Sequence, residues 1–123
     1  MKLHPHSVAS LAVTGVSATS LSVAQVEHHT SIAVHGSIGV QAWSKSNLTD
    51  IDESDIDAWV AARPELVVIG CGSKHSFLNP RLAVRLSNSG IGLECMSTPA
   101  AARTYNVLLD EGRDVLGAFL ITP

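Results

Sequence analysis

The stretch "ELVVIGCG", residues 65–72, decides the fold. It is a short, uninterrupted apolar run that ends in a glycine-rich turn. A strand that is buried on both faces has this pattern, because neither of its sides meets water. Strands of this kind belong to parallel sheets that helices cover. The run therefore predicts an α/β fold with the chain turning sharply at Gly70–Gly72.

The next segment, "LNPRLAVRLSNSG" (residues 78–90), carries the signals of a short helix. Asn79 occupies the cap position, Pro80 the first helical position, and Gly90 follows the last turn. An Asn side chain can accept from free N–H groups at a helix start, and glycine tolerates the left-handed conformation that ends a helix. We predict a helix directly after the buried strand.

Alternation continues to the end of the chain. "GLECMS" (92–97) has the pattern of a strand, "TPAAARTYNVLLDEGR" (98–113) of a helix that starts at Thr98 and Pro99, and "DVLGAFLIT" (114–122) of a closing strand. The carboxy-terminal half therefore reads β-α-β-α-β, which predicts helices packed on a largely parallel sheet.

The amino-terminal part is richer in β-formers. "SLSVAQV" (20–26) and "TSIAVHG" (30–36) predict two strands, with the intervening "EHH" (27–29) as their hairpin turn, and "IGVQAWS" (38–44) continues the pattern. Residues 1–7 are expected to be frayed, because no signal ties them down.

A change of period marks "LTDIDESDIDAWVAARP", residues 48–64. Ile56, Trp59 and Val60 recur at helical spacing, and acidic residues crowd the start, where they suit the positive end of a helix dipole. Read as a calcium loop from Asp50, the segment has Asp55 where glycine is needed and lacks the closing glutamate. We predict a helix that Pro64 stops.

The totals limit the classes of function. The chain has 123 residues, of which 46% are hydrophobic and 15% charged, which fits one folded domain over residues 1–123. The net charge is −3 and basic residues are scattered, so nucleic-acid binding is disfavoured. Cys71 and Cys95 form no paired metal motif, no apolar run reaches about 20 residues, and reduced thiols favour a cytoplasmic location. We expect no metal, no cofactor and no membrane span.

The helix at 98–113 poses the functional question. Its apolar face includes Tyr105, whose hydroxyl would need a partner if buried, while Arg103 and Asn106 lie on another side. Glu111 and Arg113 fall at its end. Two interpretations remain open: these charges form a structural ion pair at a corner, or they line a polar pocket that the turn at residues 70–72 also reaches.

Several segments together resemble one small family. They are "ELVVIGCGSK" (65–74), "GIGLECMSTPAAARTYNVLLDEGRDV" (90–115) and the tryptophan of "IGVQAWS". The chain resembles, over about residues 13–120, a family of domains of unknown function that includes the mitochondrial respiratory complex I assembly factor 3 and an adipogenesis-associated protein. In that family Gly-Thr-Gly is usual where Gly70-Cys71-Gly72 stands, and Asp is usual at Ser97. The resemblance implies a three-layer α/β domain: a central mixed sheet, helices on one side and small amino-terminal antiparallel strands on the other.

The glycine turn matches none of the common catalytic or phosphate-binding motifs. "GCGSKHS" (70–76) lacks the spacing of a phosphate loop, of a dinucleotide fingerprint and of a nucleophile elbow. Cys71 is a small buried apolar residue in the plainer interpretation, or a reactive thiol if Lys74 or His75 lowers its pKa. Cys95 is expected to serve packing. The six histidines show no metal spacing.

Two functions follow as hypotheses. The first is a non-enzymatic protein-binding or assembly module, whose partner would be a respiratory-complex subunit, as the resemblance implies. The second is a small metabolite-binding protein or enzyme that uses the groove near Cys71, Thr98, Glu111 and Arg113. Self-association through an open strand edge is a further possibility. The candidate binding groove consists of Gly70, Cys71, Gly72, Thr98, Arg103, Tyr105, Asn106, Glu111 and Arg113.

Overall fold

A computed structural model describes residues 11–73 and 76–121, and it contains two sheets and three α-helices. The larger sheet has five strands in the order β5-β4-β8-β6-β7. Its strands are β4 (Ile32–His35), β5 (Gly39–Ala42), β6 (Leu66–Gly70), β7 (Gly92–Met96) and β8 (Val115–Phe119). β6 pairs in parallel with β7 and with β8, whereas β4 pairs antiparallel with β5 and β8, so the sheet is mixed.

β6, which lies within the apolar run "ELVVIGCG", is deep in this sheet. All five residues of β6 are buried, and so are all five of β8. Side chains of alternating residues enter two separate core clusters, one on each face of the sheet. The prediction of a parallel strand buried on both sides is confirmed.

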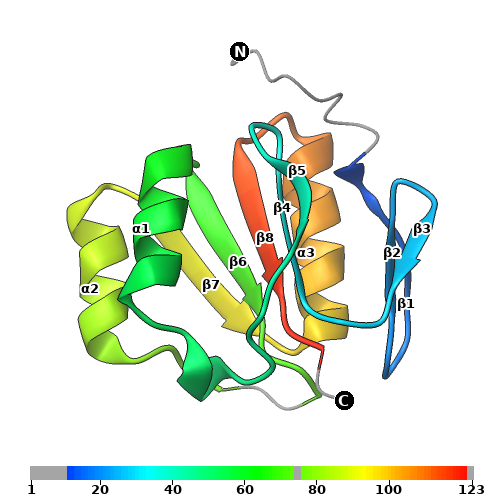
Figure 1. The fold of residues 1–123 in the computed structure, drawn as a ribbon. Coiled ribbons are helices and arrows are strands. Elements are labelled where there is room, and N and C mark those ends of the chain that lie inside the picture. The colour runs from blue at the N-terminus through cyan, green and yellow to red at the C-terminus, as the bar shows by residue number, and fades with distance from the viewer. Residues whose placement is uncertain (1–10, 74–75, 122–123) are drawn as a thin grey trace.

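Two helices cover one face. They are α1 (Glu53–Ala62), which follows a short 3-10 turn at Leu48–Asp50, and α2 (Pro80–Asn88). Figure 1 shows both on the same side of the sheet. Their buried side chains include Ile56, Trp59, Leu82 and Leu86, which pack against β6 and β8 residues in one cluster.

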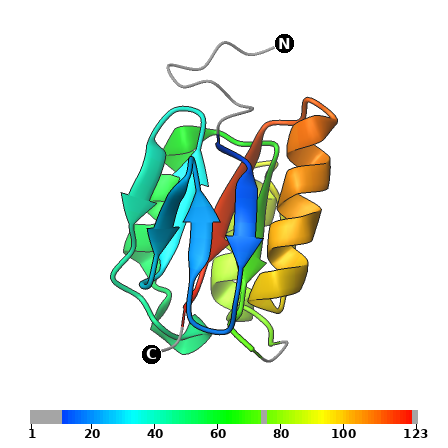
Figure 2. The same cartoon turned by 90° about the vertical axis from the view of Figure 1, so that its right-hand side faces the viewer.

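The third helix, α3 (Thr98–Asp110), covers the opposite face together with a small antiparallel sheet. That sheet contains β1 (Val13–Val16), β2 (Leu21–Val23) and β3 (Val26–His28) in this order. Figures 1 and 2 place α3 beside β1. The α/β class and the three layers are therefore confirmed. The arrangement differs from the predicted one in one respect: α3 lies on the same face as the amino-terminal strands and not beside α1 and α2. The reason is that α2 and α3 cross the sheet on opposite sides.

The predicted hairpin turn at residues 27–29 is wrong. The chain turns at Ala24 and Gln25, which both have positive φ angles of 53° and 65°, and Val23 pairs with Val26 across this two-residue loop. Such loops usually carry Asn-Gly or Asp-Gly, because most residues avoid positive φ. Ala-Gln gives no such signal, and the turn predicted at residues 27–29 therefore lies too far along the chain. The expectation of fraying at residues 1–7 falls outside the described residues.

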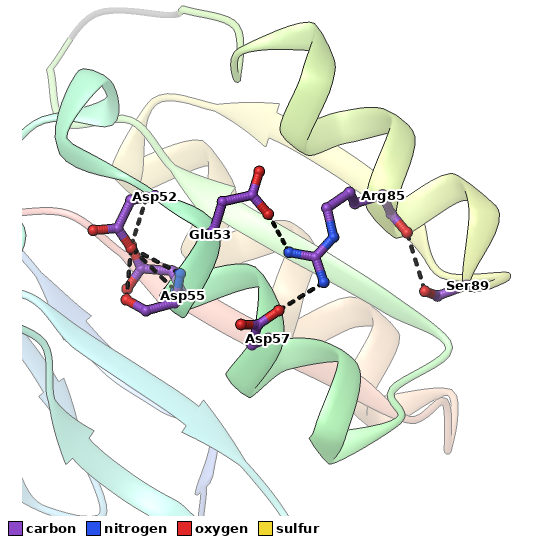
Figure 3. A network of polar contacts seen from close by, with 7 residues as sticks. Asp52, Glu53, Asp55, Asp57, Arg85 and Ser89 are labelled. Carbon is purple, nitrogen blue, oxygen red and sulfur yellow. Dashed lines mark hydrogen bonds and ion pairs between the residues drawn. The ribbon is translucent and has the colours of Figure 1, made fainter.

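The acidic start of α1 is an N-terminal cap. Asp52 accepts from the N–H groups of Ser54 and Asp55, and the Asp55 side chain accepts from the Asp52 N–H in return. Farther along the helix, Arg85 of α2 donates to Glu53 and to Asp57 Oδ1, the latter at 2.6 Å, so that it links α1 and α2 (Figure 3). The acidic cluster is therefore used inside the fold, as the cap interpretation expected.

Candidate functional site

Thr98, the first residue of α3, lies buried where three segments of the chain meet. Its Oγ1 accepts from the Gly72 N–H at 2.9 Å and donates to the Leu120 carbonyl at 2.7 Å. Its own N–H donates to the Gly72 carbonyl at 2.8 Å. Ser97 holds the cap position of the helix. Thr98 thereby connects, through these hydrogen bonds, the start of α3 with the turn after β6 and with the chain after β8.

Close approach at this junction requires glycine at position 70. A Cβ atom there would lie 2.8 Å from Thr98 Oγ1 and 2.9 Å from Thr98 Cα, distances that real Cβ atoms do not adopt. These contacts bring Gly70, Gly72 and Thr98 together at the start of α3.

A cavity of about 610 Å³ opens beside the junction. Its walls come from the β1–β2 turn, the turn after β6, the start of α3 and the end of β8. The residues that line it are Ser17, Ala18, Gly72, Ser73, Ser97, Thr98, Pro99, Leu120 and Ile121. Among the described residues of this lining, every side chain is uncharged and the polar side-chain groups are hydroxyls, so these residues offer neutral hydrogen-bonding groups beside an apolar wall.

The position of the cavity follows from the topology. After β6 the chain enters α2 on one face of the sheet, and after the adjacent β7 it enters α3 on the other face. In open α/β sheets a crevice forms where neighbouring strands send their connections to opposite faces, and ligands commonly bind there. Gly72–Ser73 and Ser97–Pro99 are the two connections at this point, and both line the cavity.

Cys71 lies next to Gly72, and Cys95 lies on β7. Both are half-buried thiols that pack against the cluster under α1 and α2, and neither is among the described residues that line the cavity. A hydrogen bond with Cys71 and burial raise the pKa of the Cys95 thiol above its usual value. Lys74 and His75, proposed as activators of Cys71, lie outside the described residues.

Glu111 and Arg113 lie at the opposite end of α3 from Thr98. The helix has 13 residues, so its ends are separated by about 18 Å along its axis. Arg113 Nε donates to Glu65 Oε2 at 3.2 Å, which ties the end of α3 to the residue before β6. Glu111 is exposed at the helix C-terminus. The structure therefore brings neither charge to the cavity.

Tyr105 and Asn106, in the middle of α3, hold the amino-terminal strands. The buried Tyr105 hydroxyl donates to the Leu11 carbonyl at 2.8 Å, which supplies the partner that its burial requires, and burial raises its pKa. The Asn106 amide donates to the Val13 carbonyl at 2.7 Å and accepts from the Val13 N–H at 2.8 Å. Asn106 thus acts as a neighbouring strand for the edge of β1. Arg103 is exposed on the same helix.

One buried polar cluster was not expected from the sequence. His35, at the end of β4, donates from Nε2 to Asp114 Oδ1 at 2.5 Å, while its Nδ1 accepts from the Ser37 N–H at 3.2 Å. His35 and Asp114 are both buried and lie 79 residues apart in the chain. No local pattern connects residues at such a separation, so the sequence alone predicts no partner for His35.

Within residues 11–73 and 76–121, no three His, Cys, Asp or Glu side chains gather closely enough to hold a metal ion. None of the described helices has the length and apolar character needed to cross a bilayer. His4 and His6 lie outside the described residues.

Known proteins similar to this chain include an assembly factor. The NADH dehydrogenase [ubiquinone] 1 alpha subcomplex assembly factor 3 of Mus musculus is 37% identical over 86 residues, which cover 68% of this chain and 46% of that protein. The chain thus spans about half the length of this relative. An uncharacterised protein of Rhodobacter capsulatus is 38% identical over 92 residues, which cover 74% of each chain.

A solved structure shares both fold and sequence. The crystal structure of a protein from Bordetella parapertussis has a TM-score of 0.83 and 35% identity, and the match covers 89% of this chain and 94% of that one. These likenesses and the family match agree with the resemblance read from the sequence. The chain belongs to the family described as Protein of unknown function (DUF498/DUF598), which matches its residues 13–120.

Proposed function

We propose that the chain is a non-enzymatic, cytoplasmic protein-binding module that assists the assembly of a larger complex, and that its partner is a subunit of a respiratory NADH dehydrogenase. Similarity to the assembly factor of Mus musculus supports the partner class. The cavity at the start of α3 supports the place of contact, because its described lining residues combine an apolar wall with hydroxyl groups.

The hydroxyl groups and apolar wall of the described lining suit a peptide segment of a partner. Main-chain amide groups of a bound segment can pair with the hydroxyls of Ser17, Ser73 and Ser97, while an apolar side chain rests on Leu120 and Ile121. This complementarity is the observation on which the binding site depends.

Substitution of Ala18 tests the proposal. Ala18 is exposed at the mouth of the cavity, so Ala18→Arg fills the opening without disturbing the core. Ala61→Arg is the matched control, because Ala61 is exposed on α1, on the other side of the sheet. Tagged chains at native expression level are used to recover partners from the host, followed by quantitative mass spectrometry.

We expect the wild-type chain and Ala61→Arg to recover the same dehydrogenase subunit, and Ala18→Arg to lose it. Equal recovery by all three chains would place the contact elsewhere. Absence of any dehydrogenase subunit from the wild-type sample would contradict the proposed partner.

The cavity volume also favours the second candidate, a small-molecule binder. Ligand pockets commonly enclose about 300–1,000 Å³, and this cavity falls within that range. The site would then involve Thr98 and Gly72 without Glu111 or Arg113. Native mass spectrometry of the chain from its host should show a bound small molecule that Ala18→Arg lacks. A wild-type spectrum with only the mass of the polypeptide would contradict this alternative.

A further inference from the structure

Cys95 lies on β7, and Cys71 lies one residue beyond the end of the neighbouring parallel strand β6, on the same face of the sheet. Ile69 of β6 pairs with Cys95 of β7, and Cys71 lies two residues beyond Ile69. Because alternate side chains of a strand share a face, Cys71 points to the same side as Ile69. Both cysteines indeed pack against the cluster under α1 and α2. They are diagonal neighbours.

The environments of the two sulfurs differ. The Cys95 thiol forms a hydrogen bond with Cys71 and is partly buried. Both effects raise the pKa of Cys95. Cys71 Sγ lies 3.6 Å from the Ser76 carbonyl, in the loop that follows β6, where Ser76 is exposed. Cys71 is therefore the thiol that lies beside the exposed loop residue Ser76, and Cys95 is the thiol whose pKa is raised, so we assign the first attack to Cys71.

We propose that Cys71 and Cys95 form a redox-active dithiol whose substrate is a small disulfide such as oxidised glutathione. The Cys71 thiolate attacks one sulfur of the small disulfide, which forms a mixed disulfide and releases one thiolate. Cys95 then loses its proton to solvent, attacks Cys71 Sγ and releases the second thiolate. The protein loses two electrons and two protons, and the small disulfide becomes two thiols.

Closure of this disulfide requires movement of the turn after β6. Diagonal neighbours in a sheet have Cα atoms about 7–8 Å apart, while a disulfide needs about 4.4–6.8 Å. Cys71 lies just beyond the end of β6, so it can shift toward Cys95 more easily than a residue within the sheet can. The adjacent Gly72 must follow, although its N–H and carbonyl groups both bind Thr98.

This movement ties the dithiol to the cavity, because Gly72 and Thr98 line it. Oxidation would therefore change the site of the proposed function. The link to partner binding rests on that proposal, whereas the dithiol chemistry does not, since it involves only the chain and a small disulfide.

Intact mass spectrometry tests the chemistry. The full chain is incubated with oxidised glutathione beside Cys71→Ser and Cys95→Ser, each first shown by circular dichroism to be folded. We expect the wild type to lose two hydrogens and keep no glutathione. Cys95→Ser should retain one glutathione on Cys71, and Cys71→Ser should react at least tenfold more slowly than Cys95→Ser. A wild-type chain that keeps a stable glutathione adduct, or that never closes, would overturn the proposal.

Hydrogen exchange tests the movement. In the closed form we expect faster exchange of the Gly72 and Thr98 amides than in the reduced form, while amides of β8 remain protected. Unchanged exchange at Gly72 and Thr98 in a chain proven closed by its mass would overturn the coupling to the cavity. Neither measurement needs a partner protein, so failure here and failure of partner capture are distinguishable.

Discussion

Gly70 and Thr98 show how one contact between residues shapes the candidate site. The β6 backbone approaches the start of α3 so closely that position 70 has no room for a side chain. Thr98 then uses its single hydroxyl to accept from Gly72 and to donate to Leu120. The walls of the cavity are therefore fixed by a few short contacts.

We expect Gly70→Ala to lower the free energy of unfolding by about 1–3 kcal/mol, the usual range when a methyl group is forced into a packed site. Urea denaturation measures the change. Gly15→Ala is the control: the atoms nearest to its added Cβ are 3.7 Å away, so its effect should stay within about 0.5 kcal/mol. Equal losses in both variants would mean that the Thr98 contact does not matter.

Residue-level prediction from the sequence succeeded where the signal is local. The turn at Gly70–Gly72 and the need of Tyr105 for a hydroxyl partner both follow from the residues themselves, and the structure contains both. The pairing of His35 with Asp114 and of Arg113 with Glu65 did not follow, because these partners are distant in the chain. The sequence alone could not decide whether Glu111 and Arg113 form an ion pair or line a pocket, because the partner of Arg113 is Glu65, which is 48 residues away in the chain.

Among the elements, α3 has two roles that are separated along its length. Its first turn borders the cavity, and its middle holds the edge of β1 through Asn106. A side-chain amide offers one donor and one acceptor, so it can satisfy an edge strand as a neighbouring strand would. The small sheet is thereby joined to the helix by polar bonds as well as by apolar contacts.

Asn106→Ala should detach β1 from α3. Two hydrogen bonds are lost, which corresponds to about 2 kcal/mol of unfolding free energy, and the Val13 amide should exchange faster with deuterium. Arg103→Ala, on an exposed position of the same helix, serves as the control and should change neither quantity. If Val13 remained as protected in Asn106→Ala as in the wild type, the amide would have no role in holding the strand.

The cap of α1 predicts a pH dependence. Hydrogen bonds from Ser54 and Lys45 lower the pKa of Asp52 well below its usual value, so the folded state favours the ionised carboxylate. The resulting stability is complete above the pKa of the unfolded chain, near 4, and is lost as the pH falls from there toward the folded pKa.

In Asp52→Asn the amide can still cap the helix but cannot titrate. We therefore expect a smaller drop in melting temperature between neutral pH and pH of about 2 than in the wild type. Thermal unfolding followed by circular dichroism at several pH values measures the difference. Parallel curves for the two chains would show that Asp52 contributes nothing to acid sensitivity.

Elements with strong caps and periodic patterns were predictable, whereas the turn between β2 and β3 was not. Asn79-Pro80 and Gly90 mark α2 at both ends, and the structure places the helix between them. Ala24 and Gln25 adopt positive φ without any glycine or asparagine to announce it. The turn closes the Val23–Val26 pair, and neither Ala24 nor Gln25 is a residue whose type predicts positive φ.

For the molecule as a whole, self-association remains a prediction. We place it at the β3 edge of the small sheet. Asn106 occupies the β1 edge at Val13, while β3 forms the other edge of the small sheet and carries Val26, 54% exposed. β3 has three residues, Val26, Glu27 and His28, and Val26 is the exposed apolar side chain that this edge would offer to another chain.

We expect Val26→Lys to weaken any concentration-dependent association in sedimentation velocity, because a charge on an edge strand opposes pairing. Val107→Lys is the matched control, since Val107 is 57% exposed on α3. Association that both variants reduce equally would reflect general surface charge, and a wild-type mass equal to one chain at every concentration would contradict the prediction.

The place of β8 bears on how this protein is made. It is the last of the described strands along the chain, yet it lies between β4 and β6 and is the strand that joins them. Until Val115–Phe119 takes its place in the sheet, the β4–β5 hairpin and the β6–β7 pair have no strand to join them, and β4 and β6 each have an unpaired edge. A folding chain in which β8 is not yet placed therefore exposes two strand edges that can aggregate, and this intermediate is the one that a chaperone would have the most to protect.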